Sequence, residues 1–349
     1  RPSLRVHLRP PLHLRPRLHV TSLHDPISAI RVMSHRHLYA EVRGNGPALV
    51  LLHGWGLNVR VWDGLAAALR DSFRIIAVDL PGHGRSDWLP ERSSLAEQAA
   101  QVRETVEPIT DEYSLLGWSL GGQIALQLAA IPSAAPAPAR MPGSPAATAP
   151  AVDRLVLIAT TPRFTAGPGW PHGTPPQRLA AQAAGLQTDY RRTVSDFLEL
   201  QVRGSAAGAE ALEHLRAALF AHSDPPDQAS AGPSEGPREP GPPGRQIADD
   251  QSGAPGRHLA ALARDLELLR DTDLRPLLPR ITLPALVIAG QYDRVTLPAA
   301  SHALAERLPN ARFVEIRRAA HAPFLSHLAE LSALLSDFLR RQSAPGDSR

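Results

Sequence analysis

A serine flanked by glycines, in the segment GWSLG at residues 117–121, is the strongest chemical signal in this sequence. The segment follows a short apolar run typical of a buried strand and precedes residues 122–131, which have helical spacing. In that context a G-x-S-x-G pattern forms a sharp, strained turn that exposes the serine hydroxyl, and side chains in place of the glycines would collide with neighbouring backbone. The pattern predicts that Ser119 is a nucleophile.

A serine hydroxyl attacks at neutral pH only when a base removes its proton. His321 is the predicted base because it lies in the loop between the last expected strand and the last expected helix, whereas His302 and His327 fall within or beside expected helices. Asp293 directly follows a buried apolar strand, and its carboxylate would orient the imidazole and stabilise the imidazolium. Asp79, which follows an earlier strand, is the reserve candidate for the acid.

Attack by serine on an acyl group creates an oxyanion, which needs two hydrogen-bond donors already in place. We predict that these are the backbone N–H of Leu120, at the start of the helix after the nucleophile, and that of Trp55, in the segment HGWG at residues 53–56. The segment DLPGHGRS at residues 79–86 lacks the third glycine of a dinucleotide-binding loop, and the sequence has no H-E-x-x-H pattern. We therefore predict no cofactor and no metal. His53 in HGWG and His83 in DLPGHGRS are predicted to have structural roles.

The composition narrows the class of protein. The formal net charge of +3 arises in residues 1–32, which hold six arginines and one aspartate, so the remainder is slightly negative and gives no reason to expect a nucleic-acid partner. The chain has no cysteine, which excludes disulfides, thiolate metal sites and a cysteine nucleophile. It has no apolar run long enough to span a membrane and no secretory signal pattern, so we expect a soluble, cytoplasmic, monomeric enzyme without a membrane partner.

Short apolar runs alternate with stretches of helical spacing from Met33 onward, which indicates a doubly wound, mostly parallel α/β sheet. Together with the serine motif and the chain order Ser, acid, His, this alternation predicts the α/β-hydrolase fold, with a helical lid inserted after the sixth strand. The expected strands are 37–42, 48–53, 74–80, 113–117, 154–160, 285–290 and 312–316. The expected helices are 61–71, 95–106, 121–131, 299–308 and 328–341, with 177–184, 190–202, 209–220 and 258–269 in the lid.

The chain is expected to divide into regions: a disordered leader (1–32), a hydrolase core in two parts (33–160 and 284–342), a helical lid (161–283) and a tail (343–349). Two low-complexity segments, 133–151 in the core and 223–256 in the lid, are too poor in large apolar residues to pack and are expected to be disordered linkers. Position 1 is not Met, and Met33 directly precedes the first expected strand, so we predict that translation starts at Met33.

Taken together, these motifs resemble the pimeloyl-acyl-carrier-protein methyl ester esterases of biotin synthesis, over nearly all of residues 48–339 except the two linkers. The H-G-W-G and G-W-S-L-G-G elements also occur in many other hydrolases, whereas F-L-x-L-Q in the lid is far more selective for this family. The segments that carry the resemblance are HGWGLN (53–58), DLPGHGRS (79–86), LGWSLGG (116–122), RTVSDFLELQ (192–201) and AAHAPFLSH (319–327).

The resemblance implies that the chain hydrolyses the methyl ester of pimeloyl-acyl-carrier protein to pimeloyl-acyl-carrier protein and methanol, through an acyl-enzyme on the serine. It also implies lid arginines that face the acidic carrier protein: Arg192 matches the family, and Arg203 and Arg216 are substitutes at shifted positions. Asp196 stands where another basic residue is expected. The acyl site implied by the resemblance comprises Trp55, Ser119, Leu120, Phe197, Leu198, Glu199, Leu200, Gln201 and His321.

Two other functions stay open from the sequence. A broad-specificity carboxylesterase or lactonase of the same fold would use the same three residues on free small esters. A non-catalytic hydrolase-fold binding module usually lacks one of the three, whereas Ser119, Asp293 and His321 are all present here.

Overall fold

The computed structural model describes residues 38–131, 151–220 and 255–340. The predicted leader, Met33 and the predicted tail lie outside these ranges. So do the two predicted linkers, except that Ala151 begins a strand and residues 255–256 begin a helix.

Seven strands form one sheet in the order β1-β3-β2-β4-β5-β6-β7. The edge strand β1 is antiparallel to β3, and every other neighbouring pair is parallel. This confirms the predicted doubly wound, mostly parallel sheet. The strands are β1 (Ala40–Arg43), β2 (Ala48–Leu52), β3 (Arg74–Val78), β4 (Glu112–Trp118), β5 (Ala151–Ile158), β6 (Ala285–Gly290) and β7 (Ala311–Ile316).

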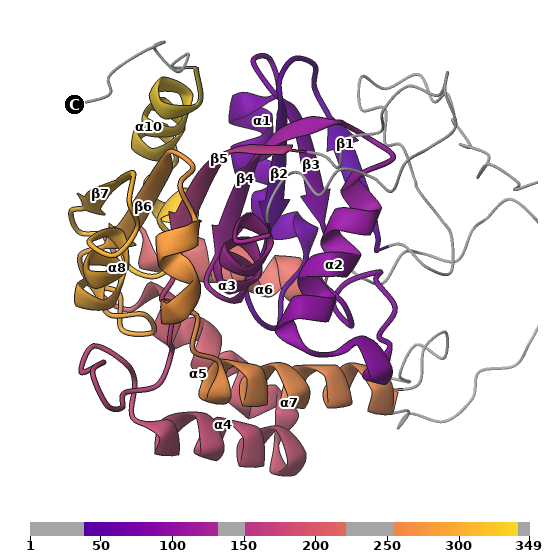
Figure 1. Ribbon diagram of the computed structural model, residues 1–349. Coiled ribbons are helices and arrows are strands. Elements are labelled where there is room, and N and C mark those ends of the chain that lie inside the picture. The colour runs from indigo at the N-terminus through magenta and orange to yellow at the C-terminus, as the bar shows by residue number, and fades with distance from the viewer. Residues whose placement is uncertain (1–37, 132–150, 221–254, 341–349) are drawn as a thin grey trace, which may run out of the picture.

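Strands β2 and β6 are apolar along their whole length because helices cover both faces of the sheet. Every residue of β2 and of β6 is buried. In Figure 1, α2 (Leu95–Val106), α3 (Leu120–Ala129) and α8 (Pro298–Ala305) lie on the face toward the viewer. The other face carries α1 (Asp63–Leu69) and α10 (Leu328–Arg340), which pack against each other. Shorter helices are α9 (Pro323–Ser326) and the 3-10 helices Val59–Trp62, Pro90–Arg92 and Arg275–Arg280.

The strand register brings the site segments to one edge of the sheet. Leu52 at the end of β2 pairs with Gly117 of β4, and Trp118 of β4 pairs with Ile158 of β5. Since the three strands are parallel and end at the same level, HGWG after β2 and Ser119 after β4 emerge side by side at the carboxyl edge.

Four helices separate β5 from β6, at the chain position where the lid was expected: α4 (Pro176–Thr188), α5 (Tyr190–Val202), α6 (Gly208–Phe220) and α7 (Pro255–Asp271). They follow the fifth strand of the described residues. Figure 1 shows α4, α5 and α7 together at one end of the sheet. Two hydrogen bonds place them at the carboxyl edge, since Trp55 Nε1 donates to Leu262 O of α7 and His321 N donates to Gln201 O of α5. None of the helices in the described ranges is long and apolar enough to cross a membrane.

Candidate active site

Ser119 sits at a sharp turn between β4 and α3, with φ 56° and ψ −117°, a backbone conformation that a residue with a side chain rarely adopts. The turn is possible because its flanking glycines have no side chain. A Cβ on Gly117 would lie 2.4 Å from Gly121 O, and one on Gly121 would lie 2.4 Å from Leu52 O. The close packing around these glycines therefore keeps the serine in its strained conformation at the carboxyl edge of the sheet.

Asp293 and His321, 28 residues apart in the chain, meet in a buried hydrogen bond of 2.8 Å between His321 Nδ1 and Asp293 Oδ2. Asp293 follows β6, and its other oxygen, Oδ1, accepts the N–H groups of Val295 and Thr296 at 2.8 and 2.9 Å. The carboxylate is thus fixed through both oxygens. Because a carboxylate accepts, the proton of a neutral His321 ring lies on Nδ1, and Nε2 carries the lone pair.

The loop that carries His321 is anchored on both sides. Its backbone N–H donates to Gln201 O at 2.9 Å, and its backbone oxygen accepts from Trp118 Nε1, the neighbour of the serine, at 2.9 Å. The rings of Trp118 and His321 lie 5.5 Å apart. Nε2 of His321 is buried and has no hydrogen-bond partner among the described residues. One ring nitrogen is therefore available to accept a proton.

The predicted oxyanion donors lie beside the serine turn. Gly54 is so close to Ser119 that a Cβ on Gly54 would lie 3.4 Å from the Cβ of the serine. Within the described part of the chain, neither the N–H of Trp55 nor that of Leu120 donates to an acceptor. Leu120 is the first residue of α3, where the helix dipole also favours negative charge. These positions bring together residue types that suit acyl transfer: a serine in a strained turn, a buried histidine–aspartate pair and backbone N–H groups beside the serine.

Known proteins resemble this chain in sequence and in architecture. The sequence profile of a family described as alpha/beta hydrolase fold matches residues 47–328. The pimeloyl-[acyl-carrier protein] methyl ester esterase of Stenotrophomonas maltophilia (strain K279a) is 35% identical over 312 residues, 89% of this chain and 99% of that protein. The protein of the same name from Nitrosomonas europaea is 34% identical over 290 residues, 83% of this chain and 94% of its own. The chain belongs to this esterase family of α/β hydrolases.

Solved structures agree on the fold of this esterase. An esterase from Exiguobacterium antarcticum superposes with a TM-score of 0.66 and 21% sequence identity, covering 87% of this chain and 96% of its own. At that identity the likeness concerns the architecture alone.

The five predicted acyl-site residues on α5 of the esterase do not share one surface, because successive residues of a helix point in different directions. Phe197 and Leu200 are half-buried, whereas Leu198 is packed in the core. Glu199 is exposed and lies 3.3 Å from Arg216 on α6. Gln201 is 1% exposed, and both polar atoms of its side chain lack a hydrogen-bond partner among the described residues. Glu199 therefore lies apart from the other four.

A cavity of about 380 Å³ opens between α4, α5 and the loop after β6. Its lining is mainly apolar and includes Phe164, Leu179, Phe197, Leu200 and Val295. The Phe197 ring packs edge-on against the Trp55 ring at 5.1 Å, so this side chain contacts both the cavity and the segment next to the serine. The cavity is suited to an apolar chain.

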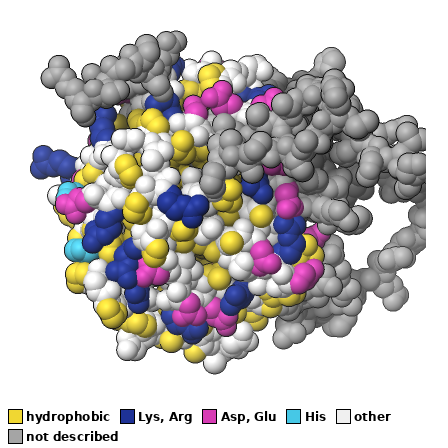
Figure 2. All heavy atoms as spheres, in the orientation of Figure 1, with side chains coloured by type: hydrophobic (Ala, Val, Ile, Leu, Met, Phe, Trp, Pro, Cys, Tyr) yellow, Lys and Arg dark blue, Asp and Glu magenta, His cyan; other side chains and the backbone are white. Residues whose placement is uncertain are grey.

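The three predicted docking arginines differ in their surroundings. Arg192 is exposed on α5, 3.8 Å from Asp196, and Arg203 is exposed just after the same helix. Arg216 is engaged by two acids, Glu199 and Glu213. Figure 2 shows arginines and acidic side chains interspersed over the visible face of the molecule. The face seen there is of mixed charge.

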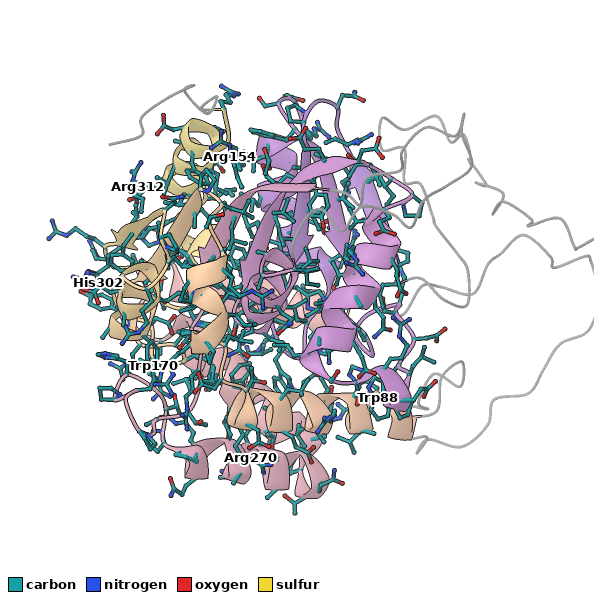
Figure 3. The ribbon with its side chains drawn as sticks, viewed as in Figure 1. Trp88, Arg154, Trp170, Arg270, His302 and Arg312 are labelled. Carbon is teal, nitrogen blue, oxygen red and sulfur yellow. The ribbon has the colours of Figure 1, made fainter. Side chains whose placement is uncertain are left out.

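The other candidates from the sequence take structural positions. Asp79 is buried and accepts the N–H groups of Val59 and Arg85 at 2.7 and 2.9 Å, so it joins two loops, and burial raises the pKa of its carboxyl to about 6. His302 lies at the outer edge of α8, as Figure 3 shows, with its ring 3.6 Å from Glu306. His327 bonds to the neighbouring Ser326 hydroxyl.

Proposed function

We propose that this esterase removes the methyl group from a pimeloyl methyl ester carried on acyl carrier protein, with Ser119 as nucleophile, His321 as base and Asp293 as the acid that orients it. The observation that carries the chemistry is the buried Asp293–His321 bond, in a loop that is tied to Trp118, the neighbour of the strained serine. The second imidazole nitrogen has no hydrogen-bond partner among the described residues. The substrate is supported by relatives of this name, which match at 34–35% identity over most of both chains.

In the first half of the reaction the Ser119 hydroxyl attacks the ester carbonyl carbon while His321 Nε2 takes the hydroxyl proton. The negative charge moves to the carbonyl oxygen, where the N–H groups of Trp55 and Leu120 stabilise it. The tetrahedral intermediate then collapses: the bond from carbon to the methoxy oxygen breaks, and that oxygen takes the proton from His321 and leaves as methanol.

In the second half a water molecule attacks the acyl-enzyme and gives a proton to His321. A second tetrahedral intermediate forms at the same oxyanion site, the bond to Ser119 Oγ breaks, and the serine recovers its proton. The product is a free carboxyl group on the carrier-bound chain. The scheme uses no metal and no cofactor, and the expectation of a cytoplasmic monomer stays a prediction.

The acyl chain is proposed to occupy the cavity lined by Phe197 and Leu200. Transfer of each methylene group from water to an apolar site lowers the free energy by about 0.8 kcal/mol, and this favours binding of a seven-carbon chain there. The exposed Arg192 and Arg203 are the better candidates for contact with an acidic carrier protein, because Arg216 is already paired with two acids.

Ser119→Ala tests the chemistry. The variant is expected to fold like the parent and to lose hydrolysis of p-nitrophenyl butyrate and of methyl pimeloyl-acyl-carrier protein, because no other group replaces the nucleophile. Circular dichroism and steady-state kinetics measure the two effects. Parental turnover by the variant would overturn the assignment of Ser119, and failure of a fluorophosphonate probe to label the parent would favour a non-catalytic binding module.

Comparison of carrier-bound and free methyl pimelate tests the substrate. A larger kcat/KM for the carrier-bound ester is expected, and Arg192→Glu with Arg203→Glu should lower it for that ester alone. Equal values for both esters would favour a generalist carboxylesterase or lactonase. Growth of a biotin auxotroph that lacks this esterase, rescued by the gene for this chain, tests the proposed role.

A further inference from the structure

Two buried polar side chains outside the proposed catalytic residues, His83 and Asp265, face each other between the core and the lid. His83 lies in the turn after β3, and Asp265 lies on α7. Asp265 Oδ1 accepts from Gln98 Nε2 of α2 at 2.7 Å. Its Oδ2 is 3.8 Å from His83 Nδ1 and has no hydrogen-bond partner among the described residues. A buried carboxylate oxygen without a donor is costly, so its position calls for a reason.

The protonation of His83 follows from its partners. The backbone N–H of Gly56 points at His83 Nε2 at 3.0 Å. A backbone N–H can only donate, so Nε2 carries a lone pair and the ring proton is on Nδ1. That N–H faces two acceptors, Pro81 O at 3.1 Å and Asp265 Oδ2 at 3.8 Å.

Gly56 ends the segment that supplies an oxyanion donor. We call residues 54–56 the oxyanion loop. Gly54 packs against Ser119, Gly56 has the φ of +75° that glycine adopts readily, and contacts from outside the loop help to hold it in place. Helix α7 supplies two of these: Leu262 O accepts from Trp55 Nε1 at 2.9 Å, and Asp265, three residues later on the same side of the helix, faces His83.

We propose that Asp265 and His83 are positioning residues for the oxyanion loop. Pro81 O accepts the ring proton of His83 on Nδ1, and the Asp265 carboxylate, 3.8 Å away, adds an electrostatic preference for that tautomer, so that Nε2 accepts the Gly56 N–H and the Trp55 N–H stays directed at the oxyanion. Helix α7 of the lid thereby couples to stabilisation of the transition state. The inference rests on the proposed function, since it requires an oxyanion at Ser119.

A purely structural role for Asp265 is disfavoured by its cost. Burial raises the pKa of its carboxyl to about 7, against an ordinary value near 4, so ionisation of this group opposes folding. Residues that lower stability while serving activity are a mark of functional sites. An amide in this place would keep the bond to Gln98 without the charge.

Asp265→Asn separates the two roles. Its amide oxygen still accepts from Gln98, but its NH2 then faces the Nδ1–H of His83, and the two donors repel. The loss of the carboxylate charge and this repulsion disfavour the proton on Nδ1, which is expected to weaken the contact between Nε2 and the Gly56 N–H. We expect kcat for p-nitrophenyl butyrate to fall about tenfold or more, with little change in KM. The loss should not exceed the ~10²–10³-fold decrease that follows when an oxyanion donor is removed outright. Affinity for a trifluoromethyl ketone, whose serine adduct carries an oxyanion, should fall by the same factor.

The thermal unfolding temperature of Asp265→Asn should equal or exceed that of the parent, which a merely structural residue would not allow. Asp271→Asn is the matched control, because Asp271 is an exposed aspartate near the end of the same helix, and it should behave like the parent. Parental kcat in Asp265→Asn, or a fall in kcat without loss of inhibitor affinity, would overturn the proposal.

His83→Gln gives a second route if Asp265→Asn folds poorly. The glutamine oxygen can accept the Gly56 N–H, so this variant should keep more activity than His83→Ala, and adding Asp265→Asn to it should lower kcat no further. An equal loss in His83→Gln and His83→Ala would contradict the proposal. His302→Gln, at an exposed histidine, is the control.

The ring proton of His83 can also be observed directly in the parent by two-bond ¹H–¹⁵N correlation, the signal being assigned by its absence in His83→Gln. A proton on Nδ1 supports the proposal and a proton on Nε2 overturns it. Because the kinetic assays use p-nitrophenyl butyrate, failure to hydrolyse the carrier-bound ester would refute the proposed substrate without affecting these outcomes.

Discussion

His321 has four polar atoms, and three of them are bound to three different segments of the chain. Its N–H is held by α5, its backbone oxygen by the tryptophan before the serine, and Nδ1 by Asp293 after β6. The fourth atom, Nε2, is left without a partner in the described structure. These contacts hold the ring in one orientation, and none of them uses Nε2. This arrangement suits a base that must accept and return a proton.

Asp293→Asn tests the role of the acid. The amide oxygen can still accept the N–H groups of Val295 and Thr296, so the fold should be retained. The amide NH2 would then face His321, which disfavours a proton on Nδ1 and leaves the wrong tautomer for attack. We expect kcat to fall on the order of 10⁴-fold, as for the corresponding change in other triads. Steady-state kinetics with unchanged circular dichroism would support this, and a loss below tenfold would contradict it.

Helix α3 is placed by glycines as much as by its apolar face. Gly122, near its start, lies against Thr160 just beyond β5, and a Cβ at this position would lie 1.9 Å from Thr160 Oγ1. The close approach keeps the start of the helix, where Leu120 is the first residue, close to the end of β5. Apolar periodicity alone would allow α3 to slide, whereas this contact fixes its distance from the sheet.

Gly122→Ala is expected to lower the free energy of unfolding by about 2 kcal/mol or more, because either the helix or Thr160 must shift. Gly64→Ala in α1 is the control: its Cβ would meet only Leu328 at an ordinary 3.6 Å, so no loss of stability is expected. Urea denaturation measures both. Equal effects of the two substitutions would contradict the packing argument.

Two buried carboxyl groups give the folded molecule a shared response to pH. Burial raises the pKa of Asp79 to about 6 and that of Asp265 to about 7, whereas both titrate near 4 in the unfolded chain. The folded state therefore holds these protons more tightly than the unfolded state does. Carboxyls whose pKa is lowered, such as that of Asp273 hydrogen-bonded to Arg275, titrate at lower pH and act in the opposite direction there.

The contribution of these two groups to the free energy of unfolding is consequently expected to be greatest below about pH 4 and to decrease as the pH rises to about 7, by on the order of a few kcal/mol. Urea denaturation at a series of pH values measures the slope. Asp265→Asn should flatten it, and the exposed Asp271→Asn should not. A stability that increases steadily from pH 5 to pH 8 in the parent would contradict this account.

The local sequence was enough to predict the sheet, the helices and the three proposed catalytic positions, because each depends on short-range rules. Apolar runs predict buried strands, GWSLG predicts the turn, and a parallel sheet gathers strand ends at one edge. Most strand ends were predicted within one or two residues, and α5 matched its predicted range. The order Ser119, Asp293, His321 along the chain needed no coordinates.

The tertiary structure decided what depends on side chains distant in sequence. No motif indicates that Gln201 O anchors His321, that Leu262 holds Trp55, or that Asp265 faces His83. These contacts join the lid to the core and arise from the docking of helices, which periodicity describes only as an apolar face. The family resemblance likewise implied that residues 197–201 form one site, whereas the turn of the helix directs Glu199 to solvent. Neighbouring residues in the sequence identify the groups that could react. The relative positions of these groups depend on the packing of segments that only the folded chain brings together.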